Sequence, residues 1–199
     1  MEDVKFLGHS FEVCKEEVSD MAVDISKAKK IAKELYETVN NVKQSMITGN
    51  IATDLDQIIK NLNLRIFEID MDEFSKKVED INFDSETSGF LIEVDNQHVI
   101  YLNKKDSMNR KRFTIAHEIG HLKLNHLGVR MRDSTTSQGT DENEVLANAF
   151  AAELLMPEEL VEWVYPMVNS VSRVAQVFGV SEIAAYNRLK NLGIINNEW

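Results

Sequence analysis

The sequence has one cysteine and lacks any long apolar run. A single cysteine excludes an intramolecular disulfide, and a lone cysteine is most often a small buried hydrophobic residue, so we assign Cys14 no function. No segment approaches the run of about 18 apolar residues that a transmembrane helix needs. The acidic start, Met1-Glu2-Asp3, differs from the basic beginning of a secretion signal. We therefore expect a soluble, cytoplasmic protein without a membrane partner.

Basic residues are also scarce, because 22 Lys and Arg stand against 33 Asp and Glu and the formal net charge is −11. Nucleic-acid affinity depends on Lys and Arg that neutralise phosphates, so this balance excludes a general nucleic-acid binder. An acidic surface favours solubility, and it favours binding to a partner with a basic surface. With 199 residues and 43% hydrophobic content, the chain is large enough to bury a core without disulfides.

Two of the five histidines stand four residues apart in the sequence His-Glu-Ile-Gly-His, residues 117–121. Four residues on a helix turn through about 400°, so both rings leave the same face about 6 Å apart. Catalytic zinc usually takes three protein ligands and leaves a fourth position for water, whose pKa falls to about 7. The spacing predicts His117 and His121 as zinc ligands and Glu118 as the general base.

The surroundings of this motif favour a metal site over a structural helix. Residues 113–122 are apolar apart from the motif and Thr114, which is typical of a helix buried on most sides. Buried histidines and a buried carboxylate are costly unless a metal or a hydrogen-bond network satisfies them. Gly120 costs about 1 kcal/mol relative to alanine inside a helix, which indicates close approach of a neighbouring backbone or of substrate.

A second helix, ended by Pro157, is predicted to supply the third ligand. At 100° per residue, one stripe of this helix holds Glu144, Asn148, Ala151 and Leu155. Glu144 is our candidate ligand, and the small Ala151 would let the two helices pack closely. Asn148 lies one turn further on, where it can accept a hydrogen bond from the second nitrogen of a ligand histidine.

Three other residues compete for a place at this site. Glu153 lies about 180° around the helix from Glu144. Glu142 sits where acidic residues favour a helix N-terminus. His126 follows His121 by five residues, about 140° around the helix, so we do not expect it among the ligands. For the group that stabilises the oxyanion no spacing selects a residue, and the conceivable groups are Tyr101, Tyr165, Arg112 and His126.

Three runs carry a family resemblance: RFTIAHEIGH at 112–121, Glu144 followed by Ala147, Asn148, Phe150 and Ala151, and Leu-Leu-Met-Pro at 154–157. Together they resemble the ImmA/IrrE family of metallo-endopeptidases. The hairpin ending at 101–103 and the segments 174–181 and 188–193 are similar as well, so the resemblance spans roughly residues 51–195.

This resemblance implies an α+β, zincin-like metallopeptidase fold with a small, mainly antiparallel sheet, two metal-binding helices and a helical C-terminal segment. It implies one zinc ion bound by His117, His121 and Glu144, with Glu118 as the catalytic glutamate and Asn148 in support. Members are bacterial proteins, often from mobile elements or stress-response loci, that cleave a helix-turn-helix repressor. Their substrate backbone would add as a strand to the edge of the hairpin.

One alternative of another class remains open. A non-catalytic antirepressor or antitoxin-like protein could sequester a repressor with a zinc-stabilised fold. Cleavage of the repressor distinguishes the two functions.

The pattern along the chain predicts three segments: an N-terminal helical segment (1–50), a zinc metallopeptidase domain (51–168) and a helical cap (169–199). The expected elements are a helix over 28–46 broken at Gly49-Asn50, a helix over 55–62, a strand over 65–69, hairpin strands over 90–94 and 99–102 with a turn near 95–97, and the motif helix over 106–125. Residues 130–141 are predicted to form a loop, either an exposed connector or a flap over the cleft.

The C-terminal segment has the pattern of two helices separated by a turn at Gly179, with Ser181 as N-cap. This pattern is similar to a DNA-binding helix-turn-helix. Residues 170–199 carry three basic and two acidic residues, too little positive charge to bind a phosphate backbone. We expect a helical cap that packs on the catalytic core or grips the protein substrate.

Overall fold

The computed structural model describes residues 10–76, 87–126 and 142–196, and for residues 10–24 the backbone alone. Its elements are α1 (Ser10–Val39), α2 (Val42–Thr48), α3 (Leu55–Asn61), β1 (Arg65–Ile69), α4 (Met71–Ser75), β2 (Gly89–Val94), β3 (Gln97–Asn103), α5 (Met108–Lys123), α6 (Glu142–Leu155), α7 (Glu158–Val168), α8 (Val171–Phe178) and α9 (Glu182–Asn191). The α+β class is confirmed. The loop expected over 130–141 and the side chain of Cys14 lie outside the described residues.

The three strands form one sheet in the order β1-β3-β2, in which β2 is antiparallel and β1 parallel to the central β3. The predicted hairpin is confirmed as β2 and β3. Asp95 and Asn96 join them with φ values of 51° and 62°. A two-residue loop in which both residues have left-handed backbone angles matches the twist of two antiparallel strands. Asp and Asn tolerate these angles better than most residues.

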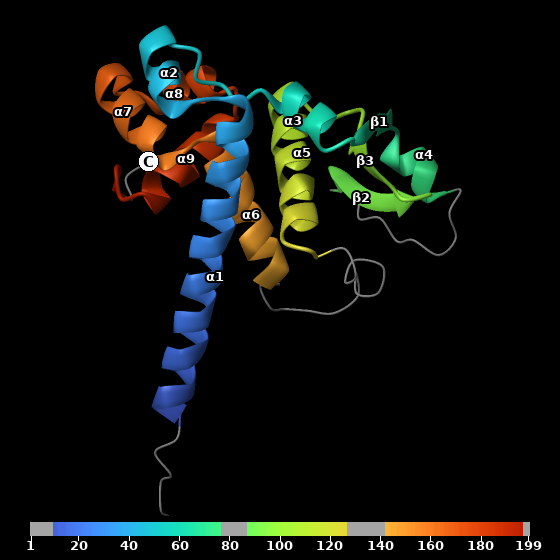
Figure 1. Cartoon of the computed structure of the whole chain (residues 1–199), viewed down its shortest axis with the longest axis horizontal. Helices are drawn as coiled ribbons and strands as arrows, with labels where there is room; N and C mark the ends of the chain where they lie inside the picture. Colours follow the sequence, from blue (N-terminus) through green and yellow to red (C-terminus); the bar gives the residue numbers. More distant parts are fainter. Residues whose placement is uncertain (1–9, 77–86, 127–141, 197–199) are drawn as a thin grey trace, which may run out of the picture.

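The two faces of the sheet differ because side chains alternate along β3. Ile100 and Leu102 are at most 2% exposed and belong to the main hydrophobic core. Between them, on the opposite face, Tyr101 stacks on Phe67 of β1 and Phe90 of β2, with ring centroids 5.8 and 5.1 Å apart. The buried face anchors the sheet to α5, which stands between the sheet and α6 (Figure 1).

The prediction of one helix over residues 28–46 is wrong in one respect, because the observed helix is interrupted at Asn40 and Asn41. Helix α1 ends at Val39, and Asn41 has extended backbone angles of −119° and 120°. The Oδ1 atom of Asn41 accepts a hydrogen bond from the backbone N–H of Gln44, so Asn41 is the N-cap of a new helix, α2. The break predicted at Gly49 is confirmed, since this residue ends α2 in the left-handed region.

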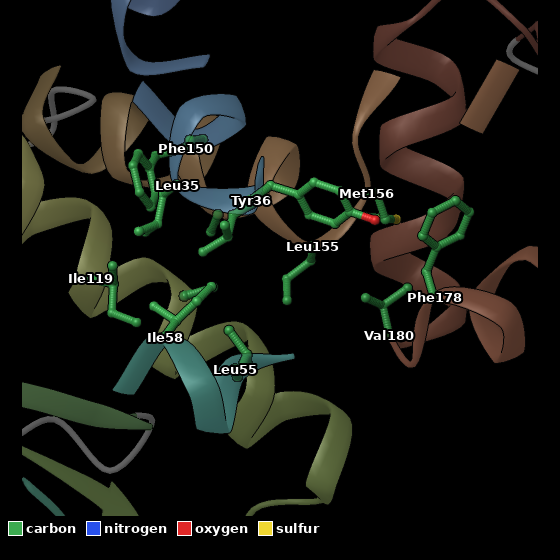
Figure 2. Packing of buried hydrophobic residues seen from close by; sticks show 14 of the residues in the cluster. Leu35, Tyr36, Leu55, Ile58, Ile119, Phe150, Leu155, Met156, Phe178 and Val180 are labelled. Carbon is green, nitrogen blue, oxygen red and sulfur yellow. The ribbon is translucent and has the colours of Figure 1, made fainter. Parts of the chain in front are cut away.

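The hydrophobic core draws on all three predicted segments, as Figure 2 shows. Tyr36 of α1, Ile58 of α3, Ile119 of α5, Phe150 of α6 and Phe178 of α8 are each fully buried. Helix α1 runs along α6, and its N-terminal part extends beyond the other helices (Figure 1). The division into an N-terminal segment, a peptidase domain and a cap stays a prediction.

The C-terminal helices have the predicted pattern of helix, turn and helix. Gly179 ends α8 with a φ of 65°, and the Ser181 hydroxyl accepts a hydrogen bond from the backbone N–H of Ala184 at the start of α9. Arg188 of α9 is 4% exposed and forms an ion pair with Glu153 of α6. The segment is therefore tied to the helix that carries Glu144.

In the described part of the chain, no helix combines the length and apolar composition needed to cross a membrane.

Candidate metal centre

Helices α5 and α6 approach each other closely at Gly120. A Cβ atom on this residue would lie 3.2 Å from the carbonyl oxygen of Ala147 and 3.1 Å from a ring carbon of Phe150. Both distances are shorter than ordinary van der Waals contacts, so the absent side chain permits this packing. Ala151, the small residue expected to help, is fully buried. The glycine predicted to allow close backbone approach does so, and the approach brings α6 next to the motif histidines.

Three polar side chains converge where the two helices meet. The Nε2 atoms of His117 and His121 are 3.0 Å apart. One carboxylate oxygen of Glu144 lies 3.1 Å from Nε2 of His117, and the other lies 3.3 Å from Nε2 of His121. In the described residues, these are the three side chains whose ligand atoms cluster closely enough to hold a metal ion.

The hydrogen bonding of His117 shows why this cluster fits a cation. Its Nδ1 atom is 3.1 Å from Oδ1 of Asn148. An amide oxygen only accepts hydrogen bonds, so a hydrogen on Nδ1 pairs with Asn148 and leaves Nε2 with a lone pair for a metal ion. The Glu144 carboxylate presents further lone pairs to the same space. Ligands held about 2.0–2.2 Å from zinc at tetrahedral angles are about 3.3–3.5 Å apart, close to the observed spacing. The two imidazoles and the carboxylate therefore fit a divalent metal ion.

The glutamate of the motif, Glu118, is 2% exposed, and His121 is 1% exposed. By contrast, the Glu144 side chain is 41% exposed and the His117 side chain 13%. The cluster is thus buried on one side and reaches solvent on the other.

The two glutamates that competed with Glu144 lie elsewhere. Glu153 is buried, forms the ion pair with Arg188, and accepts a hydrogen bond of 3.2 Å from the backbone N–H of Glu158. Glu142 is the first residue of α6, where it favours the helix N-terminus. The structure brings together the predicted set of His117, His121 and Glu144.

His126 lies outside the ligand set, as expected, but closer to His121 than the sequence analysis placed it. It is not part of the metal cluster, but its Nδ1 atom lies 3.3 Å from Nδ1 of His121. The helical-wheel argument placed it about 140° away because it assumed a continuous helix. The helix instead ends at Lys123, and Asn125 adopts a left-handed φ of 62° that turns the chain back toward His121. An asparagine just beyond the last helical turn was the available signal.

Hairpin strand β2 begins against α5. A Cβ atom on Gly89 would lie 2.6 Å from the Thr114 methyl group and from the carbonyl oxygen of Tyr101. Gly89 therefore allows the strand to start beside the helical turn that precedes His117. Within the described residues the sheet gives β2 one neighbour, β3. That a substrate adds to this edge stays a prediction.

Two of the groups considered for the oxyanion are engaged in structural contacts. Arg112 donates one hydrogen bond to the carbonyl oxygen of Gly179 and another to that of Thr53. Burial lowers the pKa of this guanidinium below its ordinary value. Tyr101 lies in the aromatic stack of the sheet. Arg112 thus links the first part of the motif helix to the segment that precedes α3 and to the C-terminal segment.

Comparisons with known proteins find a family match and several similar solved structures. A solved structure described as a Mycobacterium tuberculosis transcriptional regulator is 15% identical to this chain, with a TM-score of 0.47. The similarity covers 82% of this chain and 51% of that one, so the chain spans about half the length of the regulator. No curated protein matches the sequence.

The sequence matches the IrrE N-terminal-like domain, a peptidase family, over residues 59–190. This range covers most of the chain and includes both metal-cluster helices and most of the C-terminal segment. The resemblance indicated by the motifs is confirmed, and a metallopeptidase type of function is the one that this family suggests. The chain belongs to the IrrE N-terminal-like domain family.

Proposed function

We propose that this protein is a zinc-dependent endopeptidase that hydrolyses a peptide bond in a protein substrate. The observation that carries the proposal is the convergence of His117, His121 and Glu144 from two helices. Glu118, which follows His117 directly in the sequence, is buried beside them on the same helix. Membership of a peptidase family supports it independently.

Two imidazoles and one carboxylate are a ligand set typical of catalytic zinc, and they leave a coordination position open. The Nε2 atoms of His117 and His121 and the carboxylate of Glu144 would hold the ion. When bound, zinc supplies Lewis-acid polarisation of a substrate carbonyl and of water.

Glu118 is proposed as the general base. It takes a proton from the attacking water while the hydroxyl adds to the carbonyl carbon of the scissile bond. It then delivers that proton to the leaving nitrogen as the carbon–nitrogen bond breaks. The products are a carboxylic acid and an amine, and no further reactant is needed.

Asn148 would support the site through His117. Its amide oxygen accepts the hydrogen of Nδ1, which fixes the tautomer that leaves Nε2 free to bind the metal. The partial exposure of Glu144 and His117 gives a macromolecular substrate access to the cluster without unfolding of the core.

The proposed substrate is a helix-turn-helix transcriptional repressor, whose cleavage would relieve repression. Resemblance to the ImmA/IrrE family supports this choice. The C-terminal helices of the chain are suited to packing rather than to DNA, because one of their three basic residues, Arg188, is buried in an ion pair.

The test uses the full chain with zinc and a candidate helix-turn-helix repressor, chosen from the products of the genes that neighbour its own. We expect intact-mass spectrometry to show two repressor fragments, and neither a chelator-treated sample nor Glu118→Gln to produce them. Intact repressor that is nevertheless released from its operator would establish the alternative, sequestration without catalysis. Equal cleavage by the parent protein and by Glu118→Gln would overturn the proposed mechanism.

A further inference from the structure

His126 contacts the ring nitrogen of His121 that does not face the metal cluster. The Nε2 atom of His121 points to His117 and Glu144, whereas its Nδ1 atom lies 3.3 Å from Nδ1 of His126. The two rings are inclined by 65° with centroids 5.4 Å apart, which excludes stacking. The contact is therefore made through the ring nitrogens.

The end of helix α5 fixes this contact. The backbone N–H of His126 donates a 2.9 Å hydrogen bond to the carbonyl oxygen of His121, and the N–H of Asn125 donates one of 3.2 Å to that of Leu122. With Asn125 in the left-handed region, this is the paired arrangement of a Schellman motif. It reverses the chain at the helix end, so His126 is held against His121 by backbone bonds and not by the side chain alone.

The protonation pattern determines what such a contact can do. A histidine that binds metal through Nε2 must carry its hydrogen on Nδ1 and donate it to an acceptor. For His117 that acceptor is Oδ1 of Asn148. For His121 the atom in the corresponding place is Nδ1 of His126, which accepts when the hydrogen of the neutral His126 ring is on Nε2.

We propose that His126 is a positioning residue of the metal centre. It accepts the Nδ1 hydrogen of His121, which fixes both the tautomer and the orientation of that ring, so that Nε2 is aimed at the metal. The inference rests on the proposed metal site and deepens it: each of the two histidine ligands has its own acceptor, one from α6 and one from the end of α5.

A zinc-affinity measurement on two variants tests this role. His126→Phe keeps a ring but removes the acceptor, and His126→Asn keeps an oxygen acceptor near the position of Nδ1. In competition with a chromophoric chelator, we expect His126→Phe to bind zinc about 10–100-fold more weakly than the parent protein. His126→Asn should stay within a few-fold of the parent. Thermal unfolding of the metal-free proteins serves as the control and should be similar for both variants.

The results distinguish failure of the positioning role from failure of the proposed function. Equal zinc affinity in the parent and in His126→Phe overturns the positioning role and leaves the proposed function intact. Equal losses in both variants also overturn it, because the effect would then be steric. A parent protein that binds no zinc overturns the proposed function, and this inference with it.

A second measurement needs no variant. Nitrogen-15 chemical shifts of the zinc-bound parent protein report which nitrogen of each neutral histidine carries hydrogen. We expect His126 to carry its hydrogen on Nε2, so that its Nδ1 accepts from His121. A hydrogen on Nδ1 of His126 would contradict the inference even if the substituted proteins failed to fold.

Discussion

Oδ1 of Asn148 lies 3.1 Å from Nδ1 of His117, the ring nitrogen that does not face Glu144. We predict that Asn148→Ala weakens zinc binding by about 10–100-fold, since the tautomer and orientation of His117 are no longer held. Asn148→Asp keeps an oxygen acceptor and should bind zinc more tightly than Asn148→Ala. Chelator competition measures both. Parent-like affinity in Asn148→Ala would mean that this contact does not support the site.

Glu118→Gln should bind zinc like the parent protein and lose cleavage by about 10²–10⁴-fold, because the amide cannot accept the proton of water. His121→Ala is the contrasting variant and should lose both zinc and cleavage. Zinc content is measured on the dialysed proteins, and cleavage is measured by the rate of fragment formation. Persistent cleavage by Glu118→Gln would assign the general base to another group.

Gly120→Ala tests whether the approach of α5 and α6 positions Glu144. Alanine favours a helix by about 1 kcal/mol over glycine, whereas the new Cβ would lie 3.2 Å from the Ala147 carbonyl oxygen and must push α6 away. These effects oppose each other in the free energy of unfolding. The displacement of Glu144 from the histidines is not offset, so we expect zinc affinity to fall several-fold. An affinity equal to that of the parent protein would show that helix spacing does not limit metal binding.

Arg188→Met should reduce the free energy of unfolding by about 3–5 kcal/mol, because it leaves the Glu153 carboxylate buried without its cation. Adding Glu153→Leu to this variant removes the unpaired charge and should restore part of the stability. Urea-induced unfolding of the two variants gives the comparison. A loss below about 1 kcal/mol in the single variant would show that the pair contributes little to holding α9 on α6.

The metal cluster could be predicted because it depends on local spacing. His117 and His121 share a helix face whatever surrounds them, and Glu144 and Asn148 share a stripe of the next helix. The hairpin was equally predictable, since the Asp95-Asn96 turn lies between two alternating apolar runs. In each case the predictive pattern lies within one helix or one hairpin, although Glu144 reaches the histidines from a second helix.

Two helix ends and one strand pairing were not predicted. The side chain of Asn41 starts a new helix inside an uninterrupted apolar pattern, and the left-handed Asn125 redirects His126 against the helical periodicity. The parallel pairing of β1 with β3 joins residues 34 apart, such as Arg65 and Val99. Periodicity records which face of an element is buried, but not where a side chain ends the element or which strand lies alongside.

The most direct test of the account is an anomalous-difference map, at the zinc absorption edge, from crystals of the full chain grown with zinc. We predict one peak that lies about 2.0–2.2 Å from Nε2 of His117, Nε2 of His121 and a carboxylate oxygen of Glu144. A zinc ion bound elsewhere, or a Glu144 carboxylate that does not reach the ion held by the two histidines, would contradict the proposed catalytic centre.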